Sequence, residues 1–487
     1  MNRKQFITKA GWATGALALS PVFTSCSLRN HNENFDFQHR LPLPGEIRDD
    51  AFDLTATPEF MELTEKLYQS GFQFNNSLPG PTIRKNRGDS VTIRFNNDIG
   101  QRSIIHWHGF IVPPDMDGHP KDVITSGTYD YHYTINQRAG TYWYHPHPHH
   151  ITGEQVYKGL AGFYFVNDEE EEALNLPSGD REIPLVIQDR RADSSGEIVY
   201  NPSRPERMMT GFLGDFILVN GAPQPYHEVE PGVYRLRILN GSNARMYNVA
   251  FRNDVPFTLI GTDGGLLPEP VEITELLMAP GERADILMDF NRDFSDNRVQ
   301  LISKAFEVPS GGGMMGMRGM MGGGPEQGTA FTLMEFRIEG ESSNESVSLP
   351  EQLSRSDFPE PQDADNRRTI RLAMEMMTGH TINGRQFEMR RVDEQVNQGA
   401  TEIWDFVNES NVPHPMHIHA VQFKVLERSG GRGLLPTETG WKDTVLVMPG
   451  ERVSVIMTFD APKGVYVFHC HNLEHEDNGM MANLEII

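Results

Sequence analysis

The sequence predicts an all-β protein built from three β-sandwich domains. Short alternating runs rich in Val, Ile, Thr and aromatic residues, separated by Pro, Gly and Asn, recur along the chain, whereas long helical periodicity is scarce. Residues 79–97, 219–251 and 382–419 share one plan: a turn, a strand, a Gly break and a strand ending in Asn. Residues 276–290 and 445–459 share a second phrase around "PGER". Such self-similarity at a domain-sized period indicates triplicated sandwiches.

Two acidic breaks divide the chain. A length of 487 residues exceeds what one hydrophobic core usually serves. Residues 167–180 and 339–366 combine many acidic residues with Pro, Gly and Ser, which is typical of solvated linkers. The predicted domains are therefore residues 45–167, 180–340 and 366–487.

The N-terminus has the character of an export signal. Arg3 and Lys4 precede an apolar run at 10–23 and small residues before Cys26, so we predict a signal at 1–26 and a periplasmic or other extracytoplasmic protein. The segment "NRKQFI" resembles a twin-arginine signal with Lys4 in place of the second arginine, and the general secretory route stays open. "FTSC" resembles a lipobox. Cys26 is therefore either a lipid anchor or part of an ordinary cleaved signal.

Charge and cysteine content narrow the function. The net charge of −24 argues against a nucleic-acid partner; it either attracts cations to the surface or simply keeps the protein soluble. No stretch after the signal approaches the ~20 apolar residues of a membrane span. Cys26 and Cys470 are the only cysteines, and the first belongs to the signal or the anchor. Cys470 thus has no disulfide partner and needs its own explanation.

Histidines give the strongest functional signal. Ten of the 18 histidines lie in four short clusters, confined to the first and third predicted domains. One His-x-His pair alone is weak evidence of a metal site. Four clusters, one of which contains a cysteine, are strong evidence. The clusters are His106 and His108; His145 and His147; His414, His417 and His419; and His469, His471 and His475 around Cys470.

The spacing of these clusters predicts metal binding. Alternate residues of a strand point to one side, so each His-x-His pair offers both imidazoles to the same face. In the last cluster His469 and His471 face one side and Cys470 the other, so one tripeptide can contact two metal sites. A thiolate, two imidazoles and a weak thioether are the ligands of a blue electron-transfer copper. Cys470, His414, His475 and Met480 supply that set.

The sequence resembles the multicopper oxidase family over nearly the whole mature chain. "HWHG", "WYHPH", "HPMHIH" and "HCHNLEHEDNGM" match its motifs in order and spacing. "GLAGFYFV", "LNGSNAR", "GTDGGLL", "GWKDTV" and "EHEDNGMM" are similar to the bacterial copper efflux oxidases, a laccase-like branch. The resemblance implies three cupredoxin-like Greek-key β-sandwich domains and four coppers, one type 1, one type 2 and two type 3. It also implies one-electron oxidation of a donor coupled to four-electron reduction of dioxygen to water.

The resemblance assigns the ligands motif by motif. The type 1 copper takes Cys470, His414, His475 and Met480. The type 2 copper takes His106 and His417, one type 3 copper takes His108, His145 and His471, and the other takes His147, His419 and His469. The second domain carries no ligand and is expected to be structural and to shape substrate access.

Two acids near the motifs are candidates for proton delivery. The resemblance points to Asp117, in the loop after "HWHG", and to Glu476, directly after His475. The alternative is that both only orient histidines through hydrogen bonds, a common arrangement at metal sites. Asp443, in "GWKDTV", is a further candidate partner whose sequence neighbours leave its role open.

A methionine-rich segment points to Cu(I) as the electron donor. The segment at 311–324 is otherwise almost all glycine, and thioethers are soft ligands that select Cu(I). A second group at 374–377 is explained nearly as well by core packing. Copper efflux oxidases carry an Asp and a Met before the first type 1 histidine, whereas here Glu409 is present and the Met is absent. The candidate substrate ligands are Met314, Met315, Met317, Met320 and Met321.

The sequence leaves three functions open. The first is a monomeric cuprous or ferrous oxidase that serves copper homeostasis by detoxification, and the second is a laccase that acts on phenols with the same copper core. The third is a copper-sequestering cupredoxin protein without enzymatic activity, which the full ligand complement disfavours. A two-domain nitrite reductase is disfavoured by chain length and by the four His-x-His pairs.

Overall fold

The first sandwich begins at residue 46 and holds the first two histidine clusters. In this computed structural model the described residues are 35–309, 324–340, 349–355, 357–375 and 379–487. One sheet has the order β1 (Glu46–Ile47), β4 (Gly80–Asn86), β9 (Gly162–Asn167), β8 (Gly140–Pro146) and β6 (Ile105–His108). The other has the order β3 (Tyr68–Phe74), β2 (Ala51–Glu62), β5 (Ser90–Asn97) and β7 (Gly127–Thr134).

The second sandwich is the largest. Its seven-stranded sheet has the order β12 (Ala222–Pro223), β11 (Phe216–Val219), β10 (Glu182–Arg190), β14 (Val233–Asn240), β19 (Arg283–Asp289), β16 (Phe257–Thr262) and β17 (Gly265–Ile273). Its five-stranded sheet has the order β13 (Tyr226–Val229), β21 (Phe331–Ile338), β20 (Arg298–Ser303), β15 (Tyr247–Phe251) and β18 (Leu276–Met278).

The third sandwich carries the remaining histidine clusters. One sheet has the order β23 (Gly379–Ile382), β22 (Asn366–Glu375), β25 (Thr401–Asn408), β29 (Arg452–Thr458) and β27 (Phe423–Ser429). The other has the order β24 (Glu394–Val396), β31 (Met481–Ile486), β30 (Gly464–Cys470), β26 (His414–Ile418) and β28 (Thr444–Val447).

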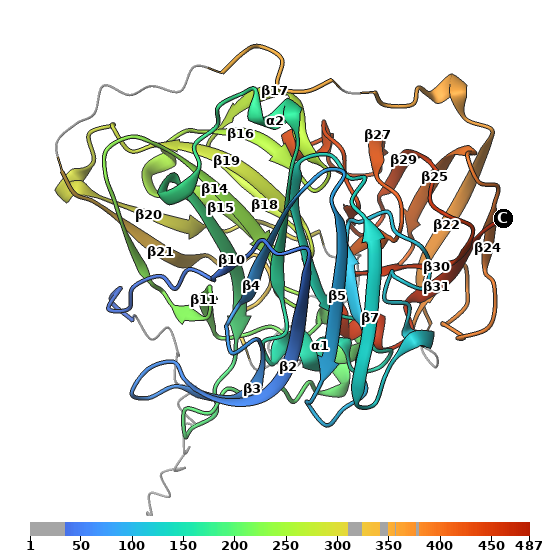
Figure 1. Ribbon diagram of the computed structural model, residues 1–487, viewed down its shortest axis with the longest axis horizontal. Coiled ribbons are helices and arrows are strands. Elements are labelled where there is room, and N and C mark those ends of the chain that lie inside the picture. The colour runs from blue at the N-terminus through green and yellow to red at the C-terminus, as the bar shows by residue number, and fades with distance from the viewer. Residues whose placement is uncertain (1–34, 310–323, 341–348, 356, 376–378) are drawn as a thin grey trace, which may run out of the picture. The chain divides into compact units, whose positions relative to one another are not determined.

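The three sandwiches repeat one topology. Each contains two corresponding parallel strand pairs among antiparallel ones: β2 with β5 and β4 with β9, β10 with β14 and β13 with β21, β22 with β25 and β24 with β31. The first sandwich has a third parallel pair, β1 with β4. Helices are short, such as α1 (Thr152–Tyr157), α2 (Glu169–Glu172) and α3 (Leu473–Asp477), and strands dominate Figure 1. The all-β prediction of three sandwiches is confirmed, and the shared topology explains the shared sequence phrases.

Each sandwich buries one core between its two sheets. Leu54 and Phe95 of one sheet pack with Tyr144 and Val166 of the other in the first sandwich, and the second and third have separate cores of the same kind. Alternate inward apolar residues on facing strands produce this arrangement. A smaller cluster around Phe163 and residues of β10 and β14 joins the first sandwich to the second.

The sequence predicted a solvated linker at 167–180. The structure shows that this acidic segment is partly buried. Glu171 in α2 is buried and forms ion pairs with Arg235 and Arg237 of β14. Two buried guanidinium groups require counter-charges, and Glu171 supplies one of them together with Glu182 and Asp285.

Candidate metal centres

Two strand pairs carry most of the histidines. β6 pairs with β8 so that His106 lies opposite His145, and β26 pairs with β30 so that His417 lies opposite His469. The two strand pairs bring His106 and His417 together in one buried region. All ten histidines of the four clusters are at most 1% exposed.

His106 and His417 point their Nε2 atoms at each other. His106 Nδ1 donates to the Asp117 carbonyl at 2.7 Å, and His417 Nδ1 donates to the Asp443 carbonyl at 2.8 Å. Each Nε2 therefore carries a lone pair, and the two Nε2 atoms are 3.3 Å apart. Two lone pairs cannot share a hydrogen bond, but both can bind one cation. This pair fits a metal ion.

His147, His419 and His469 form a second converging group, whose ligand atoms lie within 4.8 Å of one another. His419 Nδ1 donates to Asp117 Oδ2 at 2.7 Å, and His469 Nδ1 donates to the Cys470 carbonyl at 3.1 Å. The Nε2 atoms of His147 and His419 each lie 3.2 Å from His469 Nε2. The lone pairs of His419 and His469 again face each other.

His108, His145 and His471 form the third group, also within 4.8 Å. His145 Nδ1 donates to the Pro146 carbonyl at 2.9 Å and leaves Nε2 without a partner among the described residues. His108 Nδ1 and both nitrogens of His471 likewise have no partner in the described part of the chain. Buried polar atoms without partners are costly unless a ligand satisfies them. This group also fits a metal ion.

Burial keeps these imidazoles neutral. It lowers the pKa of each of these side chains well below its usual value, and the neighbouring imidazoles lower it further. Neutral imidazole is the form that binds a metal ion. The affected residues are His108, His145, His147, His417, His419 and His471.

Asp117 and Glu476 both contact these groups. Asp117 Oδ2 accepts the bond from His419, while Oδ1 lies 3.5 Å from His106 Nδ1 without a hydrogen-bond partner in the described chain. Glu476 Oε2 lies 3.2 Å from His469 Nδ1, and its Oε1 lies 3.6 Å from His147 Nε2. Burial raises the pKa of Asp117. Both carboxyl groups are placed to orient histidines, and both can also hold a proton.

Cys470 lies in a separate cluster with His414 and His475. Its Sγ is 3.5 Å from His414 Nδ1 and 3.6 Å from His475 Nδ1. The Nε2 atoms point away, to Ser410 Oγ at 2.8 Å and to the Met209 carbonyl at 3.2 Å. Burial raises the pKa of the Cys470 thiol, so the thiolate requires a cation beside it. One thiol and two inward nitrogens fit a soft metal.

Met480 is buried at the end of the same loop. The Cys470 amide donates to the Met480 carbonyl at 3.0 Å, and the Met480 amide donates to the His475 carbonyl at 2.9 Å. These two bonds tie the Met480 backbone to both neighbouring ligand candidates.

Replacing Met480 by Leu should raise the reduction potential of the thiolate site while copper stays bound. A thioether donor stabilises the oxidised metal and a hydrocarbon does not, and a Leu side chain conserves most of the volume. Redox titration of the visible absorption measures the change. An unchanged potential, or loss of the copper, would argue against Met480 as a ligand of that site.

Arg283 is the main site residue that the sequence did not identify. This buried side chain of β19 comes from the second sandwich and holds Asp443 through two bonds, Nη1 to Oδ1 at 2.8 Å and Nη2 to Oδ2 at 2.5 Å. Asp443 Oδ1 in turn accepts from His108 Nε2 at 3.0 Å. One arginine of the sandwich without ligand motifs thus positions a histidine of the first through an aspartate of the third.

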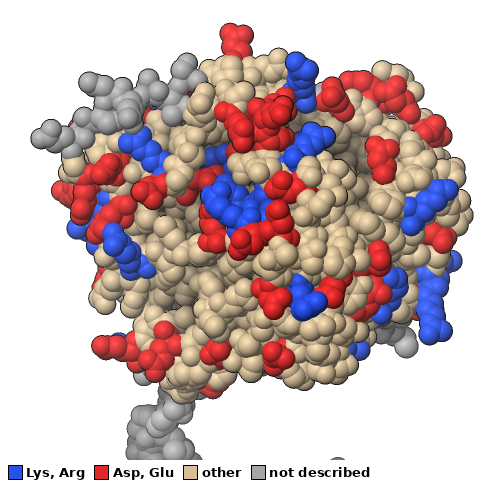
Figure 2. Space-filling model, in the orientation of Figure 1, with Lys and Arg blue, Asp and Glu red and all other residues tan. Residues whose placement is uncertain are grey.

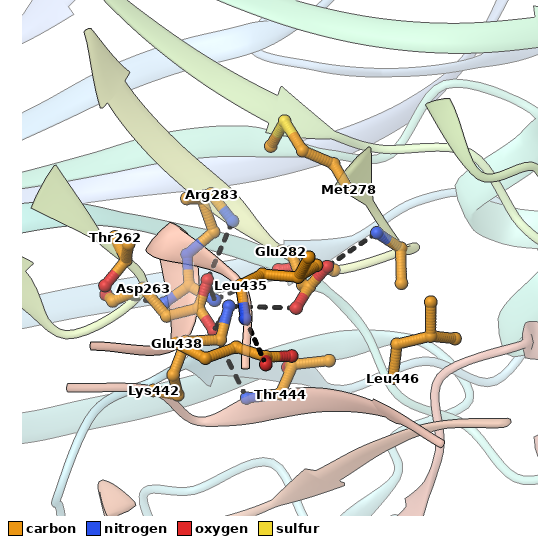
Figure 3. A network of polar contacts seen from close by, with 12 residues as sticks. Thr262, Asp263, Met278, Glu282, Arg283, Leu435, Glu438, Lys442, Thr444 and Leu446 are labelled. Carbon is orange, nitrogen blue, oxygen red and sulfur yellow. Dashed lines mark hydrogen bonds and ion pairs between the residues drawn. The ribbon is translucent and has the colours of Figure 1, made fainter. Parts of the chain in front are cut away.

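The surrounding network is almost entirely buried. Lys442 Nζ lies 2.9 Å from both Asp263 Oδ2 and Glu282 Oε1, and the Arg283 amide donates to Asp263 Oδ1 at 2.8 Å. Figure 3 shows these groups converging from segments of two sandwiches. Arg283 is the arginine of the repeated "PGER" segment. That repeat was the only sequence feature that could have pointed to Arg283.

The remaining candidates fall outside these clusters. The segment at 310–323, with all five methionines proposed to bind substrate copper, lies outside the described residues. Cys26 does too. Met374 lies in β22, directly opposite His380 of β23.

Known proteins resemble this chain over most of its length. Three family profiles, each described as multicopper oxidase, match residues 56–171, 193–299 and 359–486. A laccase of Bacillus subtilis is 33% identical, and the alignment covers 85% of this chain and 89% of the laccase. The structure of the McoA multicopper oxidase of Aquifex aeolicus is 40% identical with a TM-score of 0.82, over 92% of this chain and 99% of that one. A laccase-like multicopper oxidase, CueO, of Ochrobactrum sp. is 31% identical with a TM-score of 0.81, over 92% and 100%.

Proposed function

The chain belongs to the multicopper oxidase family, and from this premise we propose that its reducing substrate is Cu(I). It is a copper-containing oxidoreductase that uses dioxygen as electron acceptor, as the sequence predicted. The balanced reaction converts four Cu(I), one dioxygen and four protons into four Cu(II) and two waters.

We propose four coppers with the ligands named from the sequence. The observation that supports this count is the grouping of ten buried histidines and Cys470 into one thiolate cluster, one facing pair and two triads. Bound copper would accept single electrons at the thiolate site and reduce dioxygen at the histidine site. Cys470 connects the two through its peptide bonds to His469 and His471, and that short covalent path suits electron transfer.

The carboxyl groups supply the protons in this proposal. Glu476 contacts two triad histidines, and Asp117 contacts His419 and lies beside His106. Both are buried, so a proton on either oxygen is shielded from bulk water. Their hydrogen bonds also fix imidazole orientation, and the two roles are separable by experiment.

Glu476→Gln should lower turnover about 100-fold or more, the usual effect of losing a positioned proton donor. Glutamine keeps the shape and can still accept hydrogen bonds, so copper content and the visible spectrum should stay unchanged. The matched control is Glu474→Gln on the same helix, because Glu474 bonds Tyr200 and Asn243 rather than a histidine cluster. Normal turnover in Glu476→Gln would show that Glu476 does not supply the protons.

Burial of the thiolate site supports a small donor. His414 and His475 are 0% exposed, so a bulky phenol cannot touch either ring in this structure. The net charge of −24 attracts cations, and Figure 2 shows acidic side chains distributed over the face in view, with basic ones between them. The 311–324 segment stays a predicted capture site.

A laccase acting on phenols is the second candidate, because the B. subtilis relative is a laccase. Steady-state oxygen uptake with Cu(I), Fe(II) and a phenol, measured on one copper-loaded preparation, separates the candidates. We expect the highest kcat/KM with Cu(I). Faster turnover of the phenol would overturn the cuprous assignment.

Export to the periplasm, by the twin-arginine or general secretory route, stays part of the proposal. Among the described residues, no helix combines the length and apolar character needed to cross a bilayer. Lipidation of Cys26 would attach the protein to a membrane surface, and mass spectrometry of the mature N-terminus tests it.

A further inference from the structure

A cavity separate from the copper ligands lies where the first and third sandwiches meet. The first sandwich contributes Arg102, Lys121 and His150 to its lining, and the loop between β23 and β24 of the third contributes Met389 and Arg390. Its volume is about 470 Å³. Small-molecule sites typically have volumes of about 300–1,000 Å³ and often lie between domains. None of the residues assigned to copper lines this cavity.

The cavity carries positive charge on a strongly acidic protein. Acidic residues outnumber basic ones by 67 to 43 in the chain, yet no Asp or Glu lines the cavity. Arg102 donates to the His149 carbonyl at 2.8 Å, and neither Arg102 nor Arg390 has a carboxylate partner in the described part of the chain. Lys121 pairs with the adjacent Asp122. The two guanidinium groups are therefore available to an anion.

Apolar side chains line the same cavity. Pro120 is buried, Val123 is half-buried and Met389 is 37% exposed. A ligand with charged groups alone would leave this apolar surface in water. An apolar frame that carries anionic groups contacts both kinds of side chain.

Hydrogen bonds between the sandwiches hold the lining in place. His150 Nδ1 donates to the Asp477 carbonyl at 2.8 Å. The Lys121 amide donates to His119 Nδ1 at 3.0 Å, and His119 Nε2 donates to Asn483 Oδ1 at 2.9 Å. Two segments of the first sandwich are thus fixed against the third. A preformed cavity loses less conformational freedom when a ligand binds.

We infer that this cavity binds a small polycarboxylate, an anion with two or more carboxylate groups on an apolar frame. The planar guanidinium groups of Arg102 and Arg390 each present paired N–H donors that match a carboxylate, and Lys121 adds a compact positive charge. Binding at this cavity is independent of which donor the enzyme oxidises, because the cavity shares no residue with the copper clusters.

The test uses trimesate, a benzene ring with three carboxylates too far apart to chelate one metal ion, titrated calorimetrically into the copper-loaded enzyme. We expect Arg390→Gln and Arg102→Gln each to weaken trimesate binding about 10-fold or more, the scale of losing a charge-assisted hydrogen bond. Copper content and the visible spectrum should stay unchanged. Arg385→Gln is the matched control. It removes the same charge from the same loop, but its side chain is 61% exposed and does not line the cavity.

Inorganic phosphate is the second probe, because it carries charge without an apolar frame. We expect phosphate to bind about 10-fold more weakly than trimesate, since it buries no apolar surface. Equal affinity for the two anions would overturn the polycarboxylate assignment. No trimesate binding to the wild-type enzyme, or wild-type affinity in both the Arg102 and the Arg390 variants, would overturn the site itself.

Discussion

Cys470→Ser is expected to abolish both the intense visible absorption and turnover with every donor. Cys470 Sγ is the atom at which His414 and His475 converge, and a serine hydroxyl is a harder and weaker donor for copper. The His106–His417 pair lies in a separate cluster and makes no contact with Sγ among the described interactions, so the type 2 signal in electron paramagnetic resonance should persist.

The matched control is Cys26→Ser, because Cys26 is the only other cysteine of the chain. It should leave the spectrum and the specific activity unchanged. A Cys470→Ser protein that is still blue, or that turns over at a normal rate, would refute the thiolate assignment.

Arg283→Met is expected to weaken both the fold and the histidine site. Asp443 holds the pKa of Arg283 above its usual value despite burial, so the guanidinium is charged and its loss leaves a buried carboxylate unpaired. Removing one partner of such a pair typically costs about 3–5 kcal/mol. Asp443 also orients His108, so copper affinity at that triad should fall about 10- to 100-fold.

Denaturant unfolding and copper content by mass spectrometry measure the two effects. Arg298→Met is the control, because Arg298 lies in the same sandwich but its side chain is 55% exposed and pairs with Glu335 at 3.5 Å. An exposed ion pair contributes about 1 kcal/mol or less. Wild-type stability and copper content in Arg283→Met would show that the second sandwich does not support the site.

The histidine clusters were predictable because the spacing of histidines within short segments of the sequence determines which of them share a face of a strand. Strand alternation places His469 and His471 on one face and Cys470 on the other, and the structure places Cys470 with His414 and His475 and the two histidines in the triads. Likewise, the repeated phrases correspond to repeated strand pairings. Local periodicity therefore predicted the three sandwiches.

Contacts between sandwiches were not predictable in the same way. Arg283 meets Asp443 at a separation of 160 residues, and no local pattern reveals that pairing. His380 is isolated in sequence, and only the folded chain shows that its buried ring lies 3.8 Å, centroid to centroid, from that of His475. The same limit applies to Glu171, whose buried partners convert part of an apparent linker into structure.

The most direct test of the central claim is the ratio of electrons donated to dioxygen consumed, measured on protein whose copper content has been determined. Four coppers per chain, four Cu(I) oxidised per dioxygen and no hydrogen peroxide are the predicted results. A fully loaded enzyme that consumes no dioxygen, or that oxidises two Cu(I) per dioxygen and releases peroxide, would contradict the account.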